Sequence, residues 1–428
     1  MPSSLNDFIV EGKVKYGIER VVNYANLKHD NYFFVYALNK SVEPTCYEEA
    51  ILDSNWIEAM NSEIEALNEN HTWIITDLPP GRKAIRNKWI YKIKYKSSSD
   101  IDIYKARLVV KGCSKKEGVD FDETFSPVVK MSTVRCLIAL SVINSWPLFQ
   151  LDVNNAFLYG DIDDDIYMTI PKGFASKDNN NKVCKLVKSL YGLKQAPRKW
   201  NEKLVTILKE NDFVQSVNDH SLFIKSKDNK FIAFLVYVDD IVVTGNCIDE
   251  IDKFKVFLKS KFKIKDLGPL KYFLGIEVIK TEKDLCLTQR KYCLELLKEY
   301  DLLGCKHVST PMEPNSVLPY VPTKDDPLLD NITGYQKLLG KLIYLTHTRP
   351  DIAYSVHSLA QYMHTPLKSH LNLALNVLRY LKGAPGKGIR YKYYDCKNNL
   401  TGYSDADWAK CLKLENLLHV IVYSLTIV

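Results

Sequence analysis

Apolar residues recur along this chain at two different spacings, and each spacing predicts a different kind of secondary structure. A spacing of three to four residues predicts an amphipathic helix that begins near Ser54, a residue type common at helix N-caps. Its apolar face contains Ile57, Met60, Ile64 and Leu67. The same spacing predicts further helices at 134–143, from Pro197, at 250–262, at 289–303 and over most of 334–383.

Short runs rich in β-branched and aromatic residues predict strands. The runs 89–95 and 104–111 flank Ser97–Asp100 and predict a hairpin, in which Lys105 and Arg107 share one face and Leu108 lies on the other. Other strands are predicted at 148–153, 166–170, 231–243 (as strand, turn and strand), 272–279, 389–394 and 400–403. This mixture of elements predicts an α+β protein.

Length and composition indicate a globular protein with more than one structural unit. A single core stops growing at roughly 250–300 residues, and this chain has 428, of which 46% are hydrophobic. Prolines concentrated in 310–333 predict a linker there. The ten cysteines include no C-x-x-C pair, and we expect an intracellular protein with reduced thiols and no membrane span.

Positive charge is concentrated in one segment of the chain. Residues 82–116 contain twelve basic and two acidic residues, a local charge of +10 compared with +7 for the whole chain. Such a segment is typical of a surface that binds phosphates, and interleaved aromatic rings could stack on bases. The alternative is a solvated hairpin face. The aromatic residues in question are Trp89, Tyr91, Tyr95 and Tyr104.

Two adjacent carboxylates, Asp239 and Asp240, interrupt an apolar strand–turn–strand segment. Like charges held side by side repel unless a cation neutralises them, so the pair predicts a site for a hard metal ion, Mg²⁺ or Mn²⁺. Taken alone, an Asp-Asp pair is more often an exposed acidic turn.

A third carboxylate, Asp152, stands near the end of another apolar strand. Strand ends in one sheet can place three carboxylates around two metal ions about 3.5–4 Å apart. A nearby acidic run follows Gly160, and we expect it to form a solvated loop. Its members are Asp161, Asp163, Asp164 and Asp165.

Three motifs in this order resemble the reverse transcriptase of Ty1/copia-type LTR retrotransposons. They are LDVNNAFLYG at 151–160, SLYGLKQAPRKW at 189–200 and YVDD at 237–240. The resemblance continues in KARLVVKG, FDETFSPVV, KDLGPLKYFLGIEV, STPMEP, LTHTRPDIAYSV and GYSDADWA, and it covers about residues 45–409.

The resemblance implies a right-hand polymerase with fingers, palm and thumb over residues 51–310, after a lead-in segment at 1–50. A linker and connection would occupy 311–397, and an incomplete RNase H-like α/β unit would begin at 398 and end at 428. Asp405 matches the first metal-binding aspartate of that unit. Only Glu415 is acidic after Trp408, so RNase H activity is not expected, and the last residues do not resemble the family.

The resemblance also implies roles for individual residues. Asp152 and Asp239 would hold two Mg²⁺ or Mn²⁺ ions, and Asp240 would complete the acidic cluster. The substrate-contacting residues would be Lys105 and Arg107 on the triphosphate, the Val153 carbonyl, Phe157, Gly192, Lys194 and Tyr237.

Some of these assignments leave a choice open. Phe157 would collide with a ribose 2′-hydroxyl as a steric gate, or it is a core phenylalanine. Residues 274–278 would hold the primer end, or they form an ordinary hairpin. Lys194 and Arg198 flank the start of a helix and would lie near phosphates. Retroviral relatives carry glutamine where this chain has Tyr191, so no role transfers to that side chain.

The favoured function is RNA-directed DNA synthesis from dNTPs on an RNA or DNA template with a DNA primer. Other retrotransposon polyprotein products would be partners, oligomers are compatible with the sequence, and the location would be a cytoplasmic virus-like particle or the nucleus. One alternative is a catalytically dead, nucleic-acid-binding remnant. A metal-dependent phosphatase or nuclease is a more distant alternative, because the motif order and the basic hairpin are typical of polymerases.

Overall fold

The chain folds into two compact units. The computed structural model describes residues 43–95, 101–112, 123–175, 182–282, 284–313 and 318–392, and the backbone of strands 398–407 and 418–427. The first unit draws on Met1–Ser126 and Asn155–Ile207, and the second on Pro127–Asn154 and Leu208–Val428. Both units contain helices and strands, which confirms the mixed α and β content predicted from the sequence.

The first unit contains a two-stranded hairpin and a three-stranded sheet of order β1-β6-β5. Its helices and strands are α2 (Tyr47–Ala50), α3 (Ser54–Glu69), β1 (Trp73–Thr76), β2 (Asn87–Tyr95), β3 (Ile101–Val110), η5 (Ala156–Tyr159), β5 (Asp161–Thr169), β6 (Val183–Lys188) and most of α5 (Ala196–Glu210). Strands β1 and β6 were not predicted from the sequence.

Helix α3 occupies the predicted place, with two local differences. Its N-cap is Asp53 rather than Ser54, because the Asp53 carboxylate accepts a hydrogen bond from the Asn55 amide at 2.9 Å. Ile57 is 40% exposed, and the apolar face instead begins at Trp56, which is 2% exposed. The helical period was therefore right, but the buried stripe is rotated toward Trp56.

The basic hairpin forms as predicted, with β2 and β3 paired along their lengths. Its aromatic residues do not form the predicted base-stacking surface, however. Trp89 and Tyr91 are buried in the core of the first unit, and Tyr104 packs edge-on against Trp56 at 4.9 Å. Alternate strand positions share one face, and here that face is needed to cover α3. The side chain of Tyr95 lies outside the described residues.

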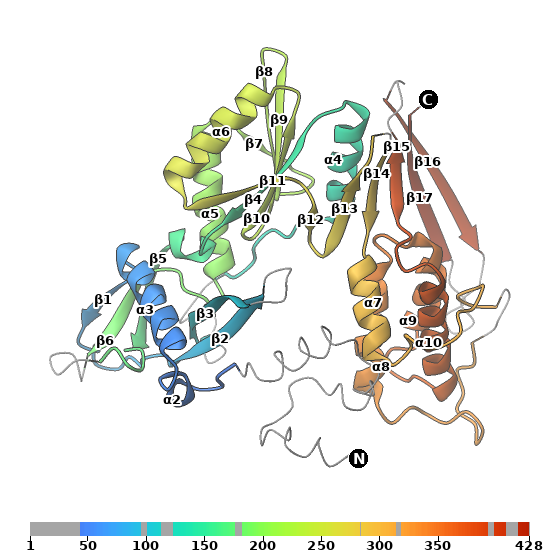
Figure 1. The fold of residues 1–428 in the computed structure, drawn as a ribbon, viewed down its shortest axis with the longest axis horizontal. Helices are drawn as coiled ribbons and strands as arrows, with labels where there is room; N and C mark the ends of the chain where they lie inside the picture. Colours follow the sequence, from blue (N-terminus) through green and yellow to red (C-terminus); the bar gives the residue numbers. More distant parts are fainter. Residues whose placement is uncertain are drawn as a thin grey trace, which may run out of the picture. The chain divides into compact units, whose positions relative to one another are not determined.

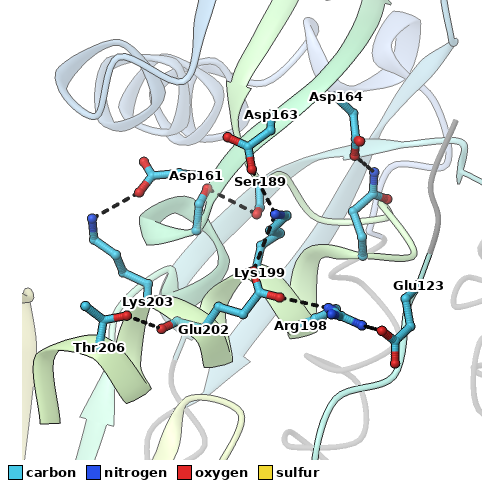
Figure 2. A network of polar contacts seen from close by, with 12 residues as sticks. Glu123, Asp161, Asp163, Asp164, Ser189, Arg198, Lys199, Glu202, Lys203 and Thr206 are labelled. Atoms are coloured by element: carbon cyan, nitrogen blue, oxygen red, sulfur yellow. Dashed lines mark hydrogen bonds and ion pairs between the residues drawn. The ribbon is translucent and has the colours of Figure 1, made fainter. Parts of the chain in front are cut away.

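The acidic run after Gly160 is solvent-exposed as predicted, apart from the half-buried Asp164, but it is not a loop. It forms the first part of β5, with a register irregularity between Asp161 and Ile166. Figure 2 shows its carboxylates pointing toward side chains near the start of α5. The pairs are Asp161 with Lys188 and Lys203, Asp163 with Lys199, and Asp164 with Gln195. Lysines distant in the sequence thus pair with Asp161 and Asp163, although these carboxylates stay at the surface.

The second unit is built on a six-stranded sheet of order β11-β4-β10-β9-β8-β7. Its strands and flanking helices are α4 (Met131–Ile143), β4 (Leu148–Val153), β7 (Val214–Gln215), β8 (Leu222–Lys227), β9 (Lys230–Tyr237), β10 (Asp240–Gly245), α6 (Ile248–Lys261) and β11 (Ile264–Pro269). Strand β4 has the predicted bounds, whereas β7, β8 and β11 were not predicted.

The two faces of this sheet are covered by different helices. In β9, Ala233 and Leu235 join the core that contains α4. Phe234 points the other way and meets Phe254 of α6, with ring centroids 5.2 Å apart. A sheet buried on both faces explains why its central strands are almost continuously apolar. The polar residues of these strands are consequently confined to the strand ends.

A four-stranded sheet and a group of helices complete the described core of the second unit. The sheet has the order β12-β13-β14-β15, and Figure 1 shows α7 to α10 side by side below it. Their bounds are β12 (Tyr272–Phe273), β13 (Ile276–Lys280), β14 (Asp284–Thr288), α7 (Arg290–Glu299), α8 (Ile332–Leu345), η7 (Pro350–Ile352), α9 (Ala353–Ala360), α10 (Lys368–Gly383) and β15 (Ile389–Lys392). The predicted strand at 272–279 is divided by a turn, and β14 was not predicted.

The C-terminal residues form a separate two-stranded sheet. Strand β16 (Asn398–Asp407) contains Asp405, which lies opposite Val420 of β17 (Leu418–Ile427). The apolar strand β17 is paired with β16 along its length. Within the described part of the chain, no helix combines the length and apolar character needed to cross a membrane.

The buried Arg349 connects η7 to the end of α10 in the second unit. Arg349 is 3% exposed, binds both carboxylate oxygens of Asp351 at 2.9 Å, and also donates to the carbonyl of Ala384. Burial by itself would raise the pKa of Asp351, but hydrogen bonds from Arg349 and Tyr380 outweigh it and hold this pKa well below its usual range. The ion pair therefore stabilises the native state above the unfolded pKa of Asp, about 3.9.

We expect Asp351→Asn to expose the α9 and α10 amides to faster hydrogen exchange, because it leaves Arg349 charged, buried and without its ion pair. The cost should be about 3 kcal/mol, or roughly a hundredfold in local exchange rate at neutral pH. The matched control is Asp325→Asn, at an exposed aspartate. As pH falls below about 4, wild type should begin to lose this advantage, because Asp351 then takes up a proton in the unfolded state. The advantage is lost fully only when pH falls through the much lower native pKa of Asp351. Equal exchange in all three proteins at pH 7 would contradict the assignment.

Candidate active site

The β9–β10 hairpin has a two-residue loop, Val238 and Asp239, between the paired residues Tyr237 and Asp240. Val238 has a φ of +55°, a left-handed conformation that costs a β-branched residue about 1–2 kcal/mol. Hairpin loops of this length normally place glycine or asparagine there. The neighbouring strand pairing therefore holds the acidic tip in a tight turn that its own sequence does not favour.

Strand β4 brings the third carboxylate to this tip. Asp240 is the register partner of Asp152, and the Val153 amide donates to the carbonyl of Asp239 at 2.9 Å. Residues directly opposite in antiparallel strands have Cα atoms roughly 4.5–5.5 Å apart and share a face of the sheet. Asp152 and Asp240 are therefore neighbours on one face of the sheet, and Asp239 lies close enough for its charge to act on Asp240.

The electrostatics of this cluster favour a bound cation. Burial raises the pKa of Asp240, and the charges of Asp239 and Asp152 raise it further. A hydrogen bond from the Gln150 side chain, at 3.4 Å, opposes this effect. The charged form of Asp240 is thus disfavoured in the protein alone, and a divalent cation beside it would reverse that preference.

The donor set fits a hard divalent ion. Carboxylate oxygens are the ligands that Mg²⁺ prefers, and it is commonly held by one or two carboxylates together with substrate phosphates and water. Among the described residues, no group of three histidine, cysteine, aspartate or glutamate side chains is arranged to hold a metal ion by itself. A divalent ion held by Asp152 and Asp240, with Asp239 beside them, would need further ligands to complete its coordination shell.

A cavity of about 520 Å³ adjoins Asp240 within the second unit. It is lined by Val129, Met131, Gln150, Tyr237, Asp240, Tyr272, Leu274, Gly275 and Tyr344. Sequence reasoning missed Gln150, although it lies two residues before Asp152 and therefore on the same face of β4. It also missed Tyr344, for which the sequence offers no signal, because helix α8 reaches the cavity only through folding.

Tyr344 fixes the turn between β12 and β13 at the edge of this cavity. Its hydroxyl donates to the carbonyl of Leu274, and both Leu274 and Gly275 have positive φ. A Cβ on Gly275 would collide with the Tyr344 hydroxyl. The segment that the sequence predicted as the primer-holding turn is therefore held in one conformation beside Asp240.

A second cluster of predicted site residues lies in the first unit. The guanidinium carbon of Arg107 lies 4.3 Å from the centroid of the Tyr191 ring, and that ring lies 4.8 Å from the Phe157 ring. Lys105 is on the same face of β3 as Arg107. Lys92 of β2 lies directly opposite Lys105. Lys92, Lys105 and Arg107 give the hairpin a cluster of basic side chains. Burial raises the pKa of the Glu63 carboxyl, and the charges of Arg107 and Lys105 oppose this rise.

The remaining predicted residues fall in different environments. Gly192 has a φ of +93°, and Lys194 is exposed. Val153 is buried, and Tyr237 lines the cavity. The Arg198 guanidinium forms ion pairs with Glu123 and Glu202, which raise its pKa (Figure 2), and its predicted place near phosphates stays a prediction.

The amino-acid sequence of this chain is similar to those of reverse transcriptases. The sequence profile described as "Reverse transcriptase (RNA-dependent DNA polymerase)" matches residues 70–314. The Pol polyprotein of transposon RE1 from Arabidopsis thaliana is 44% identical over 380 residues, which is 88% of this chain and 26% of the relative. That of transposon RE2, from the same plant, is 42% identical over 382 residues, covering 89% and 26%. The chain spans about a quarter of the length of these relatives.

Among solved structures, a similar one is described as the foamy viral protease-reverse transcriptase dRH in complex with double-stranded DNA. It has a TM-score of 0.41 and 14% sequence identity, and the match covers 93% of this chain and 65% of that one.

We expect Gly275→Ala to destabilise the second unit more than Gly268→Ala does. Both glycines have nearly the same φ, +74° and +75°, so both variants carry the cost of a left-handed alanine, about 1 kcal/mol. A Cβ at Gly268 meets no atom within 4 Å, whereas one at Gly275 meets the Tyr344 hydroxyl. Gly275→Ala should therefore lose a further 1–3 kcal/mol or so in urea unfolding.

The double variant Gly275→Ala, Tyr344→Phe separates this collision from the backbone effect. Removing the hydroxyl also removes the colliding atom, so the double variant should recover part of the stability lost by Gly275→Ala. Strictly additive losses, or equal losses for the two glycine variants, would show that Tyr344 does not constrain this turn.

Proposed function

Because this chain belongs to the reverse transcriptase (RNA-dependent DNA polymerase) family, we propose that it adds deoxynucleotides to the 3′-hydroxyl of a primer paired with an RNA or DNA template. One observation carries the proposal for this chain itself. Asp240 is the register partner of Asp152, and Asp239 occupies the adjoining loop, which docks on Val153 through a backbone hydrogen bond. This juxtaposition supports a shared metal-binding role for the three carboxylates.

Asp152 and Asp239 would bind two Mg²⁺ or Mn²⁺ ions through their carboxylates, and Asp240 would complete the acidic cluster. Such ions activate the attacking hydroxyl and stabilise the departing pyrophosphate. Gln150 orients the Asp240 carboxylate through the 3.4 Å hydrogen bond. The Val153 carbonyl keeps the ligand role that the resemblance implies. No residue of the chain acts as a covalent nucleophile in this reaction.

The basic face of β3 would bind the triphosphate of the incoming nucleotide. Lys105 and Lys92 face one another across the hairpin, and Arg107 lies two residues further along the same face. A triphosphate would relieve their mutual repulsion and accept charge-assisted hydrogen bonds. Gly192, Lys194 and Tyr237 keep the substrate-contacting roles that the resemblance implies. The RNA template and DNA primer are the proposed polymeric partners.

Phe157 would exclude ribonucleotides by contact with the sugar. Its side chain is only partly buried and packs at the margin of the first unit's core, against Tyr191. A residue used only for packing would more often be enclosed completely. This partial exposure favours the steric-gate interpretation over the core interpretation.

The turn at Leu274 and Gly275 would hold the primer end, since it borders the cavity that contains Asp240. The assignment of residues 51–310 to fingers, palm and thumb, and of 311–397 to a connection, stays a prediction that accompanies this function.

Primer extension on poly(rA)/oligo(dT) with Mg²⁺ or Mn²⁺ tests the proposed polymerase activity. Asp239→Asn should lower the extension rate by about a thousandfold or more, because a neutral amide binds a divalent ion poorly. The matched control is Asp228→Asn, an exposed aspartate in the β8–β9 turn of the same unit. It should extend primers like wild type.

Binding to the same duplex distinguishes the alternative function. If wild type binds the duplex but extends no primer, the chain is a nucleic-acid-binding remnant and the polymerase proposal fails. If Asp239→Asn extends primers as fast as wild type, the metal-binding role of Asp239 is wrong.

Phe157→Val should admit ribonucleotides, because the smaller side chain leaves space for a 2′-hydroxyl. The ratio of kcat/KM for dNTP to that for rNTP should fall by roughly tenfold or more. A control is Phe174→Val, a ring that packs against Trp89 elsewhere in the same core and should leave the ratio unchanged. An unchanged ratio in Phe157→Val would refute the gate.

A further inference from the structure

We infer that Tyr191 is a positioning residue for the incoming nucleotide. Its ring holds the Arg107 guanidinium and the Phe157 ring at fixed positions relative to each other. This inference rests on the proposed function, since it assigns Arg107 to the triphosphate and Phe157 to the sugar. It gives a role to a side chain for which the family resemblance supplied none. Tyr191 need not touch the nucleotide for this role.

The Tyr191 ring contacts both substrate-binding side chains. One contact is the Arg107 guanidinium, 4.3 Å from the ring centroid, and the other is the Phe157 ring at 4.8 Å with an interplanar angle of 60°. A guanidinium over a tyrosine ring is attracted to its negative face, and tilted aromatic pairs attract through ring edge and face. The ring is therefore a shared support for two groups that come from different elements.

The Arg107 guanidinium is held differently from those of Arg198 and Arg349. Its Nε is buried and has no hydrogen-bond partner among the described residues. In Arg198 and Arg349, by contrast, Nε donates to a carboxylate. A guanidinium whose Nε is not anchored by a carboxylate relies on packing for its orientation, and the Tyr191 ring provides a flat surface for it.

The backbone keeps Tyr191 at a fixed distance from the strand that carries Arg107. The Val110 amide of β3 donates to the Tyr191 carbonyl at 2.8 Å. The next residue, Gly192, approaches β3 so closely that a Cβ there would collide with the Val110 carbonyl. This approach, together with the positive φ of Gly192, explains why glycine follows Tyr191.

The same loop is also tied to the segment that carries Phe157. The Ser189 amide donates to the carbonyl of Gly160, directly after η5, at 2.8 Å, and the Ser189 hydroxyl donates to it at 3.2 Å. The loop 189–192 therefore links β3 and η5 through hydrogen bonds at its two ends. Between those ends, Tyr191 places its ring against Arg107 and Phe157.

This arrangement couples two kinetic properties. Loss of the Tyr191 ring should raise the KM for dNTP, because the guanidinium loses its orientation before the triphosphate binds. It should also weaken discrimination against ribonucleotides, because Phe157 can then move away from the sugar. A residue needed only for folding would lower the amount of active enzyme without changing either KM or the dNTP/rNTP ratio.

The test compares Tyr191→Leu and Tyr191→Phe with wild type in primer extension on poly(rA)/oligo(dT). For Tyr191→Leu we expect KM for dTTP to rise roughly 3- to 30-fold and the dTTP/UTP ratio to fall about tenfold. Tyr191→Phe keeps the ring and should retain both values. The control Tyr159→Leu removes a nearby tyrosine that packs against Trp200 and should change neither.

A double variant tests the link to Phe157. If Tyr191 acts on sugar selection through the gate, then adding Tyr191→Leu to Phe157→Val should not reduce the dTTP/UTP ratio further. It should still raise the KM for dTTP through Arg107. A further, additive loss of discrimination would show that Tyr191 does not act through Phe157 and would overturn the inference.

A substitute variant and a dTTP-binding measurement test the same role if Tyr191→Leu does not fold or if wild type is inactive. If Tyr191→Leu does not fold, Tyr191→Met replaces it, because methionine fills similar space without a ring. If wild type extends no primer, the proposed function fails, and the inference is judged by dTTP binding to the chain on poly(rA) with a dideoxy-terminated oligo(dT) primer. The inference would be overturned if the variant without a ring at 191 bound dTTP with unchanged affinity. It would also be overturned if Tyr191→Phe lost as much dTTP affinity as that variant.

Discussion

The pairing of β4 with β10 is the constraint on which the candidate site depends. Three acidic residues repel one another, and they stay together because the strands that carry them are apolar and buried. Leu151, Val153 and Ile241 are at most 1% exposed, so separating the strands would expose a large hydrophobic area. Burial raises the pKa of Asp240 and the neighbouring carboxylates raise it further, and a divalent cation at this position would offset both effects.

The first unit uses a different device to position its polar groups. No buried sheet carries Arg107 and Phe157 together, since they belong to a strand and to a short 3-10 helix. Backbone hydrogen bonds of the loop 189–192 connect these elements, and glycine at 192 permits the close approach to β3. Hydrophobic burial thus positions the three carboxylates, whereas backbone hydrogen bonds and ring packing position the Arg107 guanidinium and the Phe157 ring.

Local sequence patterns predicted the elements whose burial is regular. The bounds of β4 were predicted correctly, and so was the presence of the β2–β3 hairpin and of the apolar helices. In each of these elements the spacing of apolar residues matches the geometry of the strand or helix. The acidic first half of β5 was missed because its carboxylates find lysines in β6 and α5, which are distant in sequence. The role of Trp89 and Tyr91 was misjudged because periodicity tells which residues share a face and not what covers that face.

The sequence by itself determined the family, the mixed α and β content and the three candidate metal-binding carboxylates, because ordered motifs and interrupted apolar runs are local properties of the chain. Only the tertiary structure decided that Asp240 faces Asp152, that Tyr344 fixes the turn beside them, and that Tyr191 joins Arg107 to Phe157. Each of these contacts joins segments distant along the chain. Which distant side chains meet is set by strand register and core packing, and a one-residue shift in register would change every partner.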